Sequence, residues 1–99
     1  MNKMIMVMTA KSGKTRESIA SAKAGVDYVN NKYGLKAEIH MQVFGGIAGT
    51  IYLIADYEDL ASAQAMQSQV LADEKYWELV QKMADVMESP PTITLLQPV

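Results

Sequence analysis

The chain has 99 residues, a formal net charge of −2 and no cysteine. We expect one domain over residues 1–99, with a thin core, because a domain of this size buries only about 60 to 65% of its unfolded surface. The absence of cysteine excludes disulfides, a thiolate nucleophile and sulfur-ligated zinc. Without a secretory signal or an apolar run of about 20 residues, we expect a cytoplasmic protein with no membrane partner.

Charge is distributed unevenly along the chain. Residues 1–50 carry seven Lys or Arg against three acidic residues, whereas residues 51–99 carry two against eight. We interpret this asymmetry as attraction within one compact fold or between two copies of it. The acidic overall balance argues against a nucleic-acid partner, because phosphate groups would require a basic surface.

The first predicted elements are a strand over residues 3–10 and a helix that begins after Thr15 and ends before Gly34. The strand is apolar at both its odd-numbered and its even-numbered positions, which is typical of a central strand covered on two sides. Thr15 is the expected cap of the helix, and Gly34 is expected to end it in the left-handed conformation. The helix has an apolar stripe with spacings of three and four residues. Its members are Ile19, Ala22, Val26, Val29 and Tyr33.

Residues 35–57 show the period-two pattern of a hairpin. The outgoing run alternates between apolar and polar residues as far as Val43 and Phe44, a glycine-rich tip follows, and the return begins at Thr50. We predict two antiparallel strands with one apolar and one mixed face. The mixed face of the outgoing strand carries Lys36, Glu38, His40 and Gln42.

The second helical segment is predicted to be interrupted. Asp59 is the expected cap of its first part, and Asp73 can cap a new turn that continues the helix to Glu88. Pro90 and Pro91 then end all helical structure, because proline lacks the backbone donor and restrains the preceding residue. Residues 92–96 form the last predicted strand.

This order of elements predicts an α+β, ferredoxin-like βαββαβ fold. Right-handed crossovers make the first and third strands central and place both helices on one face of a four-stranded antiparallel sheet. The other face then has no cover from its own chain, although it mixes apolar and polar groups. Among the latter are His40, Gln42, Tyr52 and Thr94. We therefore predict a homodimer in which a second copy covers this face.

Three short motifs within residues 49–87 carry a resemblance to a known superfamily. They are Gly-Thr-Ile-Tyr-Leu, Tyr-Glu-Asp-Leu-Ala and Leu-Ala-Asp-Glu-Lys-Tyr-Trp-Glu-Leu-Val, with an acidic cap and a broken helix. This segment resembles the second half of the dimeric α+β barrel superfamily, which includes antibiotic-biosynthesis-monooxygenase-like and NIPSNAP-like proteins. The element order extends the resemblance over the whole chain.

The resemblance implies a homodimer whose two sheets close a barrel, with a small-molecule cavity inside the barrel or between sheet and helices. Members range from cofactor-independent oxygenases and haem degraders to isomerases and dehalogenase-like proteins. The implied ligand is a small apolar or aromatic molecule.

His40 is the only histidine and the candidate catalytic base, since histidine suits proton transfer near neutral pH. In one hairpin register it faces Ile54, and a shift sets it against Tyr52 or Asp56. Only Asp56 would orient the imidazole through a carboxylate. In the first register Glu38 would also lie opposite Asp56, which is unfavourable because both carboxylates are negatively charged. If the two carboxyl groups shared a proton, the pair would be a candidate catalytic site. The alternative is a histidine with no catalytic duty.

The candidate ligand-binding residues are Gln42, Tyr52 and Trp77. Gln42 and Tyr52 are expected on the same mixed face as His40. Trp77 follows the predicted helix break, where a large aromatic side chain can close a pocket. It can equally be the largest piece of a small core.

Two further signals are weak. Ser12-Gly13-Lys14-Thr15 imitates the end of a phosphate-binding loop, but Met8 stands where that loop requires glycine. One histidine without cysteine cannot form a multi-histidine metal site, although haem needs only one axial ligand, which would be His40. We therefore expect no metal and no cofactor.

Two classes of function remain open. The first is a homodimeric small-molecule-binding protein that catalyses cofactor-independent oxygenation or isomerisation through proton abstraction. The second is a non-enzymatic dimeric module that senses a ligand or acts as a scaffold. RNA binding ranks last, because RNA-recognition domains stack bases on aromatic residues of the sheet. Here the first strand offers methionines, and the third offers Tyr52 with no aromatic residue two positions further on.

Overall fold

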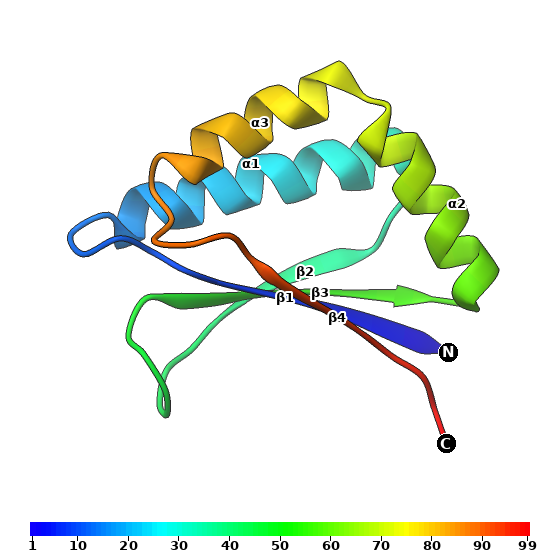
Figure 1. The fold of residues 1–99 in the computed structure, drawn as a ribbon, viewed down its shortest axis with the longest axis horizontal. Helices are drawn as coiled ribbons and strands as arrows, with labels where there is room; N and C mark the ends of the chain where they lie inside the picture. Colours follow the sequence, from blue (N-terminus) through cyan, green and yellow to red (C-terminus); the bar gives the residue numbers. More distant parts are fainter.

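A computed structural model describes all residues 1–99 and shows a four-stranded antiparallel sheet with helices on one side (Figure 1). The elements in chain order are β1 (Asn2–Thr9), α1 (Thr15–Tyr33), β2 (Ala37–Met41), β3 (Thr50–Tyr57), α2 (Leu60–Leu71), α3 (Glu74–Ala84) and β4 (Thr92–Leu96). The strand order is β2-β3-β1-β4. The predicted ferredoxin-like fold is thus confirmed, with β1 and β3 central and β2 and β4 at the edges.

The core lies between α1 and the central strands. Met8 pairs with Ile51 across β1 and β3, and both pack against Ala22 of α1 and Met87. Only 13 of the 99 residues are buried, so the core is as thin as the length of the chain predicts. Ser18, fully buried on α1, donates a hydrogen bond of 2.9 Å to the carbonyl of Val86 and ties the helix to the end of the α3 segment.

The hairpin differs from its prediction in length. Strand β2 is confined to Ala37–Met41, so Val43 and Phe44 lie in a loop over residues 42–49 instead of in the strand. Positive φ angles of 93° at Gly45 and 84° at Gly49 shape this loop, a conformation that glycine adopts at little cost. In Figure 1 the loop hangs on the side of the sheet opposite the helices.

The predicted cap at Thr15 is wrong. A turn closed by the Lys14 amide on the Lys11 carbonyl brings Lys14 to the capping position, so Thr15 is already the first helical residue. Gly34 ends α1 in the left-handed conformation, as predicted, with φ 68°.

The predicted interruption between α2 and α3 is confirmed. Asp59 accepts from the Ser62 amide at the start of α2, and Asp73 accepts from two amides at the start of α3. The predicted continuation to Glu88 is wrong, because α3 ends at Ala84 and the following residues cross to the sheet. There Met87 forms a β-bridge with Ala10, which buries its side chain in the core.

Candidate functional site

The face of the sheet opposite the helices, hereafter the open face, has an apolar centre. Across β1 and β3, Ile5 pairs with Ile54 and Val7 pairs with Tyr52, and all four side chains are only partly buried. A ring of polar and charged residues surrounds them, including Lys3 with Asp56 and the threonines of β4. Apolar groups of a protein rarely form such a continuous exposed patch without a partner.

Three of the predicted site residues meet on this face. His40 pairs with Tyr52 across β2 and β3, and the Tyr52 hydroxyl donates a 3.0 Å hydrogen bond to Gln42 Oε1. The imidazole remains 53% exposed. The registers that set His40 against Ile54 or Asp56 are therefore wrong, and no carboxylate orients the ring across the strands.

The carboxylates around His40 are loosely placed. Glu38 faces Ile54, whereas Asp56 accepts an ion-pair bond of 2.8 Å from Lys3, so the predicted contact of Glu38 with Asp56 does not form. Glu38 Oε2 lies 3.7 Å from His40 Nε2, and both side chains are exposed. This pair is too solvated to fix the imidazole, because exposed ion pairs contribute little.

Gln42 holds the 42–49 loop in place. Its Nε2 donates to the carbonyls of Gly45 and Ile47 at 2.8 and 3.1 Å, while its Oε1 accepts from Tyr52. Thr50 Oγ1 donates to the same Ile47 carbonyl. The loop therefore has a defined shape although its apolar side chains face solvent, with Phe44 91% exposed.

Trp77 lies apart from the other three predicted residues. It belongs to α3, on the helix side of the sheet, and its Nε1 donates a 2.8 Å hydrogen bond to the Leu71 carbonyl at the helix break. Its ring meets Tyr76 edge to face at 5.6 Å and is about half exposed. It cannot line a ligand on the open face of its own chain.

A groove between α1 and the edge strand β2 is a second hollow, on the helix side. It has a volume of about 430 Å³, within the range of small-molecule sites. Its apolar lining is Ile19, Val26, Ala37, Ile39, Met41 and Ile51, and its rim is Lys23, Asp27 and Asn30. Sequence patterns did not indicate this groove, because it depends on the distance between a helix and a strand.

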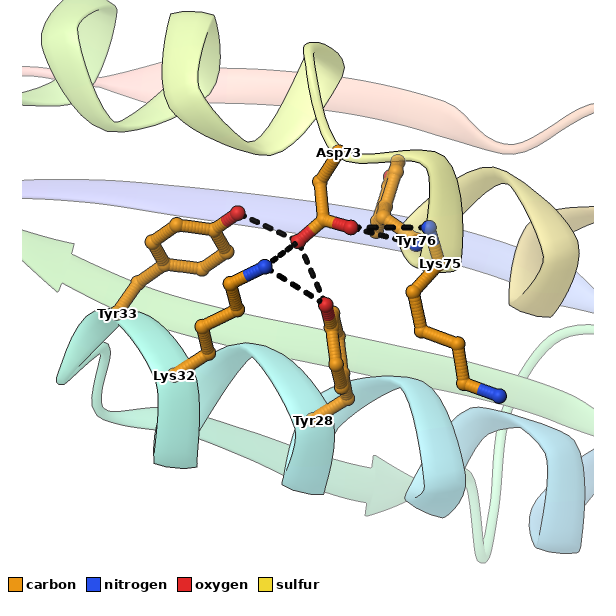
Figure 2. A network of polar contacts seen from close by, with 6 residues as sticks. All are labelled: Tyr28, Lys32, Tyr33, Asp73, Lys75 and Tyr76. Carbon is orange, nitrogen blue, oxygen red and sulfur yellow. Dashed lines mark hydrogen bonds and ion pairs between the residues drawn. The ribbon is translucent and has the colours of Figure 1, made fainter.

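A polar cluster on Asp73 was also missed (Figure 2). Its Oδ2 accepts from the Tyr28 hydroxyl at 2.7 Å, the Tyr33 hydroxyl at 2.5 Å and Lys32 Nζ at 2.9 Å. Its Oδ1 accepts from the amides of Lys75 and Tyr76. The side chain of Asp73 is only 4% exposed, so one carboxylate joins the end of α1 to the start of α3.

These contacts shift the acidity of the cluster. Hydrogen bonds from Tyr33, Tyr28 and Lys32 hold the pKa of Asp73 well below its usual range, against the opposing effect of desolvation. The hydrogen bond to Asp73 raises the pKa of Lys32 and of Tyr33. Asp73, Lys32 and Tyr33 thus keep their ordinary charges at neutral pH, which suits a structural clasp between α1 and α3 better than a proton-transfer site.

The i, i+4 spacing of Tyr28 and Lys32, with Tyr33 beside them, was the available signal for this cluster. It places their polar ends near one another on α1 but says nothing of a partner 45 residues away in the chain. No group of three His, Cys, Asp or Glu side chains is arranged to hold a metal ion. None of the helices combines the length and hydropathy that a membrane crossing requires.

The fold is shared with solved structures of low sequence identity. An uncharacterised NIPSNAP domain protein from Burkholderia xenovorans superposes with a TM-score of 0.84 at 15% identity, over 100% of this chain and 95% of the other. A NIPSNAP family protein from Agrobacterium tumefaciens gives 0.82 at 14%, over 99% and 85%. A candidate antibiotic biosynthesis monooxygenase from Nitrosomonas europaea gives 0.75 at 16%, over 100% and 99%.

No protein-family model matches the sequence, and neither does the sequence of any curated protein. At these identities the structural neighbours establish the fold and nothing finer. The resemblance expected from the sequence is confirmed at that level: the chain has the ferredoxin-like fold of the NIPSNAP and antibiotic biosynthesis monooxygenase-like proteins.

Proposed function

We propose that the protein is a homodimer whose two open faces meet and enclose a small apolar or aromatic molecule. The observation that carries this proposal is the apolar centre of the open face, Ile5, Val7, Tyr52 and Ile54, which no part of the chain covers. A second copy offers the same apolar centre and is the simplest cover.

The total surface supports association. The chain exposes 6591 Å², whereas a monomer of 10.9 kDa typically exposes about 5,600 Å². The excess of about 1,000 Å² is comparable with the roughly 800 Å² that each partner buries in a stable interface. The 42–49 loop lies on the same side of the sheet. Its exposed apolar residues Val43, Phe44 and Ile47 add to the surface that a second copy can cover.

In the enclosed space, Tyr52 offers an aromatic face and a hydroxyl oriented by Gln42. His40, beside it, accepts a proton from the bound compound and leaves a carbanion. The carbanion is reprotonated at another atom in an isomerisation, or gives its electrons to dissolved dioxygen, the oxidant, in a cofactor-independent oxygenation. Two structural neighbours named as antibiotic biosynthesis monooxygenases are in keeping with such chemistry. Trp77 lies on the helix side and takes no part in this site.

The probe 8-anilinonaphthalene-1-sulfonate, which fluoresces in apolar sites, tests where a ligand binds. We expect saturable binding by the dimer, weakened about tenfold or more by Tyr52→Ala, because stacking area is lost. Trp77→Phe, the matched aromatic change on the helix side, should leave the affinity unchanged. Absence of saturable binding, or loss only in Trp77→Phe, would refute a site on the open face.

A non-enzymatic ligand-sensing or scaffold module is the second candidate, favoured by one observation. His40 is half exposed and lacks an orienting carboxylate, which is a poor environment for a general base. In any assay where the dimer turns over a compound, His40→Ala should lower kcat about a hundredfold if His40 is the base. An unchanged kcat would favour the module. RNA binding gains no support, because Tyr52 is the only aromatic side chain on the strands of the open face.

A further inference from the structure

The side-chain amide of Gln42 can take only one orientation. Its nitrogen Nε2 lies 2.8 Å from the Gly45 carbonyl oxygen and 3.1 Å from the Ile47 carbonyl oxygen. An amide nitrogen carries two N–H donors, and these two carbonyl groups use both of them. If the amide were flipped, its oxygen would lie against two other oxygens with no proton between them, which is repulsive. Nε2 therefore faces the 42–49 loop, and Oε1 faces Tyr52.

The loop closes tightly over this amide. A Cβ atom at Gly46 would lie 3.1 Å from both Nε2 and Oε1 of Gln42, so a side chain at this position would push against the amide. The two hydrogen bonds to the loop and the close approach of Gly46 leave the Gln42 side chain little freedom to turn. Its nitrogen is therefore available neither to Tyr52 nor to a ligand.

The fixed amide determines the direction of the hydrogen bond to Tyr52. Gln42 Oε1 and the Tyr52 hydroxyl oxygen lie 3.0 Å apart, and an amide oxygen can only accept. Tyr52 must therefore donate its single hydroxyl proton to Gln42. No other group of the chain donates to the Tyr52 oxygen, so only lone pairs remain on it. Tyr52 can accept a further hydrogen bond but has no proton left to donate.

The Tyr52 oxygen belongs to the proposed ligand site. Tyr52 lies in one row across the sheet, between His40 of β2 and Val7 of β1, and Thr92 of β4 ends the row. Residues paired directly across strands share a face, so all four side chains lie on the open face. A second copy over this face would remove solvent from the Tyr52 oxygen. A buried acceptor without a partner is unfavourable, so a ligand that supplies a proton there is favoured.

We propose that Gln42 is a positioning residue that makes the site selective for aromatic compounds with a hydroxyl or N–H donor directed at the Tyr52 oxygen. This inference rests on the proposed enclosed site and specifies which ligands that site prefers. A compound that presents only an acceptor at this point, such as a ring nitrogen, places its lone pair against those of Tyr52. Such a compound should bind more weakly than one of similar size with a donor.

A pair of probes that differ in one donor tests the role of Tyr52. Indole carries an N–H, and in 1-methylindole a methyl group replaces that hydrogen. By isothermal titration calorimetry, we expect the wild-type dimer to bind indole about tenfold more tightly. Tyr52→Phe keeps the ring and removes the oxygen, so it should weaken indole binding about tenfold and leave 1-methylindole unchanged. If the methyl group merely collided with the Tyr52 oxygen, Tyr52→Phe would strengthen 1-methylindole binding instead.

Quinoline, whose ring nitrogen can only accept, tests the role of Gln42. Gln42→Met keeps a side chain of similar length without the amide, so the Tyr52 hydroxyl is free to turn and donate. We expect quinoline to bind about fivefold more tightly to this variant than to wild type, and indole binding to change little. Thr50→Val is the control for a loosened loop, because it removes the hydrogen bond from Thr50 to the Ile47 carbonyl and leaves Gln42 and Tyr52 unchanged. Its affinity for quinoline should equal that of wild type.

The outcomes separate this inference from the proposed function. A preference for indole that Tyr52→Phe abolishes, with a gain for quinoline in Gln42→Met and not in Thr50→Val, supports the inference. Equal binding of indole and 1-methylindole by the wild type, stronger 1-methylindole binding by Tyr52→Phe, or an absent or unselective gain for quinoline overturns it and leaves the enclosed site standing. Failure of indole to bind to a dimer that binds 8-anilinonaphthalene-1-sulfonate has the same meaning. A dimer that binds none of these compounds saturably overturns both.

Discussion

The Asp73 cluster and the open face of the sheet differ in how completely their polar groups are paired and shielded from solvent. Around Asp73, five donors converge on one carboxylate that is almost inaccessible to solvent. On the open face, His40 and Glu38 are loosely paired beside an exposed apolar centre. Complete pairing suits a clasp that defines the fold. Incomplete cover suits a surface reserved for a partner or ligand.

The largest expected effect is on dimerisation, which should depend on the open face and not on the Asp73 cluster. Ile54→Glu would place a charge in the centre of the proposed dimer interface, and we expect the dissociation constant to rise about a thousandfold, roughly 4 kcal/mol. Ser68→Glu, which adds the same charge to the exposed surface of α2, is the control. Sedimentation velocity measures both, and a stable Ile54→Glu dimer would remove the open face from the interface.

Asp73→Ala should break the clasp instead. Tyr28, Tyr33 and Lys32 lose their common acceptor and α3 loses its cap, so we expect the melting temperature to fall by on the order of 10 °C at fixed protein concentration. Glu74→Gln, the neighbouring exposed acid, should change it little. The dissociation constant of the Asp73→Ala dimer should stay within a few fold of the wild type. Loss of the dimer in this variant would mean that the two regions are coupled.

Acid should act selectively on the clasp. Because the folded-state pKa of Asp73 is depressed, its contribution is complete above its unfolded pKa of about 3.9 and is lost as pH falls through the folded value. We expect the melting temperature of Asp73→Asn to lie below that of wild type at pH 7, and the gap to narrow below about pH 4. Calorimetry from pH 7 to pH 2 measures it. If the difference in melting temperature between the two proteins did not change with pH, the loss of stability in Asp73→Asn would come from altered hydrogen-bond geometry and not from the lost negative charge.

The smallest expected effect concerns the 42–49 loop. Phe44→Ser should leave the melting temperature of a monomeric Ile54→Glu background unchanged, because the ring is already 91% exposed. In the otherwise native dimer it should weaken association by about tenfold, as expected when one apolar side chain per copy loses its burial. Equal effects in both backgrounds would show that Phe44 packs within its own chain.

Some features of the protein could be predicted because their signals are local. Gly34 and Asp73 act on the few backbone groups beside them, so their roles as helix terminator and cap can be read from neighbouring residues. Alternation along β2 likewise assigns His40 and Gln42 to one face, since successive strand residues point to opposite sides. The order of elements then determines the topology.

Other features depended on residues distant in the chain. Alternation leaves the register open by two residues, and packing of the whole sheet was needed to set His40 against Tyr52. The helix break was foreseen at Asp73, but the convergence of Tyr28 and Tyr33 on it was not, because it requires the approach of two helices. Trp77 is predicted to line a ligand site from its place after the helix break, but its separation from His40 and Tyr52 depends on where α3 lies relative to the sheet.

The sequence by itself therefore determined which segments are helices and strands, how they are connected and which sheet face stays uncovered, since these follow from backbone geometry and short-range periodicity. Only the tertiary structure decided the strand register, the clasp on Asp73 and the groove beside β2. Those depend on the relative positions of elements, which are set by long-range packing that no local pattern records.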